Sequence, residues 1–182
     1  MDDVKRWDTT ESERVHVNPW FSVRKDNFLG PDGNPGVYYV AEKVSAAIII
    51  PEHEDGTLTV TTQMRYPVGK VLYDFPAGMV DPGEDPGQTA LRELREETGY
   101  VATDCVPIGS FYTSPGLTTE RAYVFVARGL SMGIASPDEM EDIAVFRFTR
   151  SEIERLTSES DVSGFILSSL YLYDRWKSGS ES

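Results

Sequence analysis

The sequence predicts a mixed α/β protein of the α+β type, in which strands outnumber helices. Two observations predict this class. Several short segments rich in β-branched residues are separated by turn residues along the chain, which is typical of strands. A helical hydrophobic period replaces this pattern only after Asp85 and again near the C-terminus. The length suits one compact unit with a small appendage.

The first half of the chain predicts strands and turns. Residues 16–43 read as strands around a turn-rich centre at residues 31–36. Three further strands are expected at residues 44–50, 58–65 and 71–75. Asp55 and Gly56 suit a hairpin connection between the first two of these strands.

A helix is predicted from Asp85 to Gly99. Asp85 can cap its N-terminus, Pro86 suits the first helical position, and Gly99 is placed to end it. After this helix, three strands are expected at residues 106–112, 122–127 and 143–148. Residues 151–154 open a short helix capped by Ser151, and residues 162–176 form a final amphipathic helix. Residues 177–182 are expected to be a disordered tail.

The composition excludes several classes of function. Thirty acids against 17 bases give a net charge of −13, which argues against a nucleic-acid binder. No apolar run approaches membrane-spanning length, so no membrane partner is expected. Cys105 is the only cysteine, so no intrachain disulfide can form, and a cytoplasmic protein is expected.

Three glutamates of the predicted helix point to a metal site. Glu93, Glu96 and Glu97 stand at positions i, i+3 and i+4 and therefore share one helix face, where like charges repel. A solvated acidic face is the ordinary explanation for such a group. A hard divalent cation with oxygen ligands would instead turn the repulsion into binding.

The exact spacing favours the metal site. Gly78, five residues, Glu84, seven residues and then Arg-Glu-Leu-Arg-Glu-Glu-Thr-Gly ending at Gly99 form a complete Nudix box, with Tyr100 as a mild departure. The chain thus resembles the Nudix hydrolases, which implies a mixed sheet between helices. The resemblance also implies Mg²⁺, with Mn²⁺ as an alternative, an in-line displacement at phosphorus, and a set of metal ligands: the carbonyl of Ala77, Glu93, Glu96 and Glu97.

Residues outside the box resemble one branch of the family, the ADP-ribose and nucleotide-sugar pyrophosphatases. They comprise residues 63–68, 74–78 and 114–121, with Pro115 sixteen residues after Gly99. The resemblance implies hydrolysis of ADP-ribose to AMP and ribose 5-phosphate. GDP-mannose or another nucleotide sugar, a house-cleaning triphosphatase and a non-catalytic nucleotide-sugar sensor stay open as alternatives.

The resemblance also implies roles for individual residues. The acidic loop at residues 136–143 would supply the general base, Glu139 or alternatively Glu141. The other expected catalytic residues are Arg92, which could orient a glutamate, and Glu84. Among the expected substrate contacts, Trp20 would stack on the base and Tyr38 would form the opposite wall of the base site. The guanidinium of Arg65 would bind the diphosphate, and the loop residue Pro115 would also contact substrate.

Three regions are expected by the same resemblance. Residues 1–43 would form a small N-terminal antiparallel β-sheet that serves dimerisation and substrate contact, residues 44–176 the hydrolase domain, and residues 177–182 the tail. The expected partners are a nucleotide sugar and a second copy of the chain in a homodimer.

Overall fold

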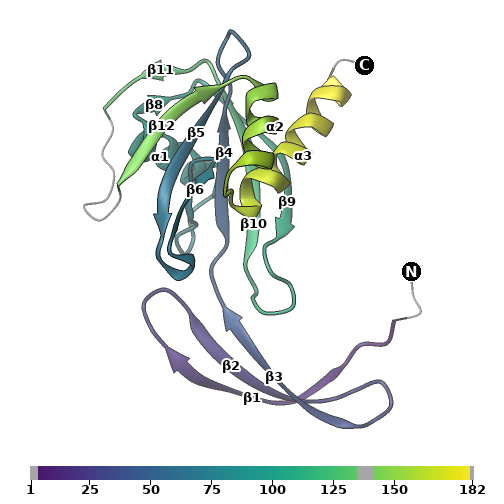
Figure 1. Cartoon of the computed structure of the whole chain (residues 1–182). Helices are drawn as coiled ribbons and strands as arrows, with labels where there is room; N and C mark the ends of the chain where they lie inside the picture. Colours follow the sequence, from purple (N-terminus) through teal and green to yellow (C-terminus); the bar gives the residue numbers. More distant parts are fainter. Residues whose placement is uncertain (1–3, 135–141, 181–182) are drawn as a thin grey trace. The chain divides into compact units, whose positions relative to one another are not determined.

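The computed structural model describes residues 4–134 and 142–180 (Figure 1). The chain forms two compact units, one of Met1–Val44 with Tyr112–Glu120, and one of Ser45–Phe111 with Arg121–Ser182. A division near residue 44 was expected. The inclusion of Tyr112–Glu120 in the first unit was not.

The first unit contains a three-stranded antiparallel sheet of β1 (Asp8–Val17), β2 (Ser22–Leu29) and β3 (Pro35–Glu42), in the order β1-β2-β3. Strand β1 begins at Asp8, earlier than the expected position 16. Every residue of β1 is exposed, and two register irregularities interrupt its pairing with β2. A strand of this kind lacks the alternation of apolar and polar residues by which strands are recognised.

The second unit contains the remaining strands, except that the last residue of β9, Tyr112, belongs to the first unit. A four-stranded sheet has the order β7-β4-β10-β9, with β4 parallel to β10 and antiparallel to β7. An antiparallel sheet has the order β12-β5-β6, and β11 pairs with β8. The bounds are β4 Ala46–Pro51, β5 Leu58–Arg65, β6 Lys70–Asp74, β7 Ala77–Met79, β8 Tyr100–Val101, β9 Asp104–Tyr112, β10 Arg121–Arg128, β11 Ser131–Met132 and β12 Ile143–Phe148. A 3₁₀ turn, Tyr66–Val68, joins β5 to β6.

Strand β4 is buried on both of its faces by helices. Ala47 and Ile49 pack with residues of α1 (Pro86–Thr98), whereas Ile48 and Ile50 pack with residues of α2 (Arg150–Glu159) and α3 (Gly164–Ser180). Figure 1 shows α1 on one side of this sheet and α2 with α3 on the other. A continuous apolar strand such as β4 is typical of a sheet covered on both faces. The expected mixed sheet between helices is therefore confirmed.

Two predicted helix boundaries in the second unit were wrong. Helix α2 begins earlier than Ser151, because Thr149 caps it and forms a reciprocal capping box with Glu152. Helix α3 continues to Ser180, so residues 177–180 are helical and do not belong to a disordered tail.

The reason for the longer α3 is a buried carboxylate on the sheet. Glu52 is only 8% exposed, and it accepts hydrogen bonds from Lys177 Nζ at 2.5 Å, Arg128 Nε at 2.7 Å and the Tyr173 hydroxyl at 2.9 Å. A buried carboxylate needs such partners, and Lys177 provides one only while α3 remains helical. In the described residues, no helix has the length and apolarity needed to span a membrane.

Candidate active site

Helix α1 is fixed at both ends and along one face. The side chain of Asp85 accepts hydrogen bonds from the backbone N–H groups of Gly87 and Gln88, at 2.9 and 3.3 Å. Gly99 ends the helix at φ 76°, a left-handed conformation that favours glycine, and its N–H donates to the carbonyl of Arg95. Leu94 is fully buried against the sheet. This anchoring sets the direction in which the glutamates of α1 project.

Strand β7 passes close to the first of these glutamates. Its residues Ala77 and Gly78 pair with Ile48 and Ala47 of β4. A Cβ atom at Gly78 would lie 1.9 Å from Oε1 of Glu93, so only glycine allows the carboxylate to approach the backbone this closely. The first glycine of the box thus has a structural reason.

The third glutamate also contacts β7. Glu97 is only 8% exposed, and its Oε1 accepts a hydrogen bond from the backbone N–H of Ala77 at 3.2 Å. Ala77, whose carbonyl was expected to bind metal, therefore lies beside Glu97, whose side chain was expected to bind metal.

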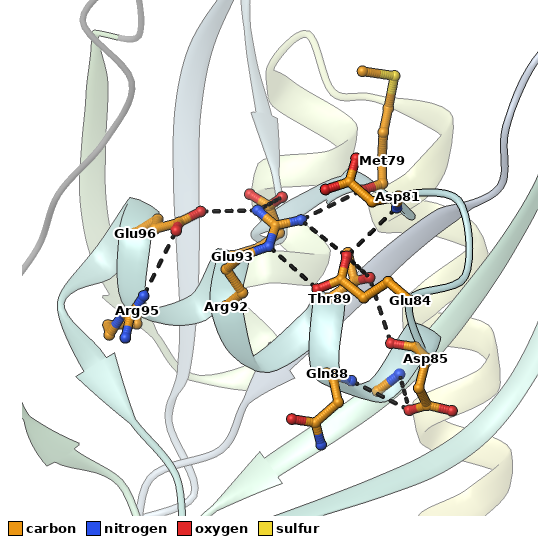
Figure 2. A network of polar contacts seen from close by, with 11 residues as sticks. Met79, Asp81, Glu84, Asp85, Gln88, Thr89, Arg92, Glu93, Arg95 and Glu96 are labelled. Carbon is orange, nitrogen blue, oxygen red and sulfur yellow. Dashed lines mark hydrogen bonds and ion pairs between the residues drawn. The ribbon is translucent and has the colours of Figure 1, made fainter.

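Arg92 lies at the centre of the acidic group. Figure 2 shows its guanidinium between Glu96 on one side and Glu84 on the other. Its Nη1 donates to Glu93 Oε1 at 2.7 Å and to Glu96 Oε2 at 2.9 Å, and its Nε donates to Glu84 Oε1 at 3.4 Å. Burial alone would lower the pKa of Arg92, but the hydrogen bonds that it donates to Glu84 and Glu96 raise its pKa above the usual value. Arg92 was expected to orient one glutamate, and it contacts three.

Glu84 is held in place by further hydrogen bonds. Its Oε2 accepts from the hydroxyl of Thr89 at 2.7 Å and from the N–H of Asp81 at 3.4 Å. The Thr89 hydroxyl, followed by Arg92, holds the pKa of Glu84 below its ordinary value. Glu84 is therefore a charged anchor for Arg92, and it ties the loop before α1 to the helix.

The gathered residues fit a hard divalent cation in their chemistry. In the described parts of the chain, no three His, Cys, Asp or Glu side chains converge on one point as metal ligands would. Two carboxylate oxygens, one from Glu93 and one from Glu96, instead converge on a single cationic nitrogen of Arg92. A cation at such a point would find only oxygen donors, which Mg²⁺ and Mn²⁺ prefer.

Arg65 is paired with an acid that the sequence did not single out. Its Nη2 lies 3.5 Å from Oδ2 of Asp74, which is 3% exposed, and Oδ1 of Asp74 accepts from the N–H of Phe75 at 2.9 Å. Burial raises the pKa of Asp74 to about 6. The signal that could have identified Asp74 is an acid in the short apolar segment of β6, three residues before Ala77.

The remaining expected residues fall into two groups. Trp20, Tyr38 and Pro115 belong to the first unit, and all three are exposed. Glu139 and Glu141 lie outside the described residues. The structure thus gathers six of the expected residues on α1, β7 and the loop between them, namely Ala77, Glu84, Arg92, Glu93, Glu96 and Glu97.

Two family models match consecutive parts of this chain. Residues 42–165 match the NUDIX domain, and residues 7–41 match the nucleoside diphosphate sugar hydrolase N-terminal domain. ADP-ribose pyrophosphatase of Bacillus subtilis (strain 168) is 34% identical over 85% of this chain and 84% of its own length. Methanol dehydrogenase activator of Bacillus methanolicus is 31% identical with the same coverage.

A solved structure shares the fold. The crystal structure of an ADP compounds hydrolase superposes with a TM-score of 0.87 at 23% identity, over 99% of this chain and 98% of that chain. The NUDIX domain match alone covers more than half of the 182 residues. The chain therefore belongs to the Nudix hydrolases, a family whose members depend on a divalent cation.

Proposed function

We propose that this Nudix hydrolase cleaves the diphosphate bond of a nucleotide sugar with Mg²⁺, and that ADP-ribose is its preferred substrate, giving AMP and ribose 5-phosphate. The observation that carries the proposal is the set of box carboxylates gathered around Arg92 on α1. The choice of substrate is supported by the N-terminal domain match and by the Bacillus subtilis relative, whose name is ADP-ribose pyrophosphatase.

Each box residue has a task in this proposal. Glu93, Glu96, Glu97 and the carbonyl of Ala77 would hold the cation. When bound, the cation neutralises phosphate oxygens and fixes the diphosphate for in-line attack by water. Gly78 leaves space for Glu93, as the close approach of that carboxylate to the backbone indicates.

Residues outside the box would bind substrate and move a proton. Arg65 offers a fork of donors that suits diphosphate oxygens, and the buried Asp74 restricts its position. Glu139 would accept the proton of the attacking water, with Glu141 as the alternative.

Trp20 and Tyr38 would provide the walls of the base site. The side chain of Trp20 is 66% exposed, which removes the explanation that it is a core residue. Its backbone N–H donates to Asn18 Oδ1 at 2.9 Å, so the turn that carries the ring is ordered. We predict that Trp20→Ala raises KM roughly tenfold, the value of one lost base–aromatic stack, with kcat nearly unchanged. An unchanged KM would remove the stacking role.

We also propose that the active form is a homodimer in the cytoplasm. The sheet of the first unit has only three strands, and it leaves large apolar side chains exposed, among them Val37 at 52% and Tyr39 at 55%. A sheet this small needs a covered apolar face to be stable. Light scattering during size-exclusion chromatography tests the dimer, and a monomer at micromolar concentration would contradict it. The lone Cys105 suits a reducing compartment.

A second candidate function comes from one relative. The Bacillus methanolicus protein is named as an activator of methanol dehydrogenase and is almost as similar as the pyrophosphatase. The complete set of box carboxylates favours hydrolysis, because a protein that only bound a partner would not need to gather them around Arg92.

A panel assay tests the proposal. The full chain is incubated with Mg²⁺ and with ADP-ribose, ADP-glucose, GDP-mannose or oxidised nucleoside triphosphates, and the products are identified by chromatography. We expect AMP and ribose 5-phosphate, with ADP-ribose giving the highest kcat/KM. Preferred release of pyrophosphate from triphosphates would replace the nucleotide-sugar proposal with the house-cleaning one. No turnover of any compound would favour the activator.

A further inference from the structure

The segment Tyr112–Glu120, which carries Pro115, is bound to strand β3 of the first unit. The backbone N–H of Ala41 donates to the carbonyl of Leu117 at 2.9 Å, and the N–H of Thr119 donates to the carbonyl of Ala41 at 3.1 Å. Ala41 and Thr118 form an isolated parallel bridge. The segment therefore behaves as a short extension of the N-terminal sheet.

Side chains strengthen this attachment on both sides of the bridge. The hydroxyl of Tyr38 donates to the carbonyl of Gly116 at 2.6 Å. The Oγ1 of Thr119 accepts from the N–H of Lys43 at 3.0 Å and donates to the carbonyl of Lys43 at 3.1 Å. The Nζ of Lys43 also pairs with Oε1 of Glu120 at 2.5 Å.

Glu120 fixes the end of the segment. It is 7% exposed, and its second oxygen accepts from the hydroxyl of Thr113 at 2.7 Å. A buried carboxylate is costly unless its oxygens are paired. The bond from Thr113 to Glu120 therefore joins the two arms of the loop at its base, and Lys43 ties Glu120 to the end of β3.

The turn at the tip is closed on itself. The carbonyl of Ser114 accepts from the N–H groups of Leu117 and Thr118, at 2.9 and 2.8 Å. Together with the bond from Tyr38 to the carbonyl of Gly116, these contacts restrict the backbone of the tip. The exposed ring of Pro115 is thus presented on a backbone whose position depends on β3.

We infer that β3 positions the Pro115 turn for substrate, and that the hydroxyls of Tyr38 and Thr119 are positioning groups for it. The inference rests on the proposed function, in which Pro115 contacts the nucleotide sugar. It gives the hydroxyl of Tyr38 a task separate from that of its ring. It also explains why a segment far along the chain belongs to the N-terminal unit.

Tyr38→Phe tests the inference, because it keeps the ring and removes the hydroxyl. Tyr39→Phe is the matched control, since successive side chains of a strand point to opposite faces and Tyr39 is 55% exposed. Each full-length variant is examined by amide hydrogen exchange of the peptide that spans residues 112–120, and by steady-state kinetics with ADP-ribose and Mg²⁺.

We expect Tyr38→Phe to speed exchange in this peptide about threefold to tenfold and to raise KM by a similar factor, the range of one net hydrogen bond, with kcat within about twofold. Tyr39→Phe should change neither. Thr119→Val should reproduce the effect, whereas Thr119→Ser, which keeps the hydroxyl, should restore normal exchange and KM.

Two results would overturn the inference. Unchanged exchange in Tyr38→Phe and Thr119→Val would show that these hydroxyls do not hold the turn. Faster exchange with an unchanged KM would show that the turn does not serve substrate binding. Failure of the proposed function is distinct from both, because the unaltered protein would then hydrolyse no nucleotide sugar in the panel assay.

Discussion

Replacing Asp74 with asparagine should stabilise the protein at neutral pH. Asp74 is 3% exposed, and the raised pKa of about 6 is due first to burial, against which hydrogen bonds from Ser163 and the charge of Arg65 act. Asparagine has the same shape, carries no charge, and can still accept the hydrogen bond that Phe75 donates. The substitution therefore removes the cost of a buried charge while keeping the packing.

The magnitude follows from the difference between the folded and unfolded states. The pKa of Asp74 rises from the ordinary 3.8 to about 6, which corresponds to about 3 kcal/mol. Because the folded-state pKa is the higher one, the native protein binds more protons than the unfolded chain between these values, so stability falls as the pH rises through this window. We expect Asp74→Asn to gain about 3 kcal/mol at pH 7.5 and only about 1 kcal/mol at pH 4.5.

Urea unfolding at the two pH values measures this difference. The fluorescence of Trp176 reports on the second unit, since this ring packs against its core, whereas Trp7 and Trp20 are exposed in the first unit. Asp161→Asn is the control, because the carboxylate of Asp161 is exposed and pairs with the exposed Lys70. A gain for Asp74→Asn that is equal at both pH values, or a loss at pH 7.5, would refute the reasoning.

Three further predictions concern the site. Glu97→Gln should reduce turnover more than about 100-fold and weaken Mg²⁺ binding in calorimetry, with an unchanged circular dichroism spectrum; near-normal activity would remove the metal-site assignment. Gly78→Ala should displace the adjacent box carboxylate and lower kcat/KM at least tenfold at a stability cost of about 1 kcal/mol, whereas Gly164→Ala, which has open space around it, should leave activity unchanged. Glu139→Gln should reduce kcat about 100-fold or more with little change in KM, and the same result for Glu141→Gln alone would move the general base to that residue.

The parts of the fold that the sequence predicts well are those set by local signals. Helix α1 starts and ends where its cap, Asp85, and its terminal glycine, Gly99, were expected to place it. Strand β4 was expected from its β-branched residues, and the structure places it at Ala46–Pro51. Strand β1 was largely missed, because its exposed residues carry no hydrophobic period.

Features set by distant contacts were not predictable in this way. The last residues of α3 stay helical because Lys177 meets Glu52, a residue 125 positions away in the sequence. The segment Tyr112–Glu120 joins the first unit through backbone bonds to Ala41, and backbone bonds leave no mark on residue type. Asp74 is similar, since only the fold reveals that it is buried beside Arg65.

The site itself shows why motif spacing predicts membership of a site better than it predicts contacts. Spacing on a helix places Glu93, Glu96 and Glu97 on one stripe, and all three lie within the helix Pro86–Thr98 of the structure. A stripe of three like charges would disfavour the helix if nothing compensated them. Spacing alone does not reveal which neighbours provide the compensation.

The compensation comes from different groups for different glutamates. Glu93 and Glu96 share one nitrogen of Arg92, while the backbone N–H of Ala77 donates to Glu97. Each carboxylate of the stripe therefore has a hydrogen-bond donor in the folded chain, and these are the oxygens that would bind a divalent cation. The fourth acid of the box, Glu84, accepts hydrogen bonds from Nε and Nη2 of Arg92, whereas Glu93 and Glu96 accept from Nη1. Arg92 thus stabilises the acidic stripe. Because Arg92 also pairs with Glu84, a cation can compete with it for the oxygens of Glu93 and Glu96 without leaving the guanidinium unpaired.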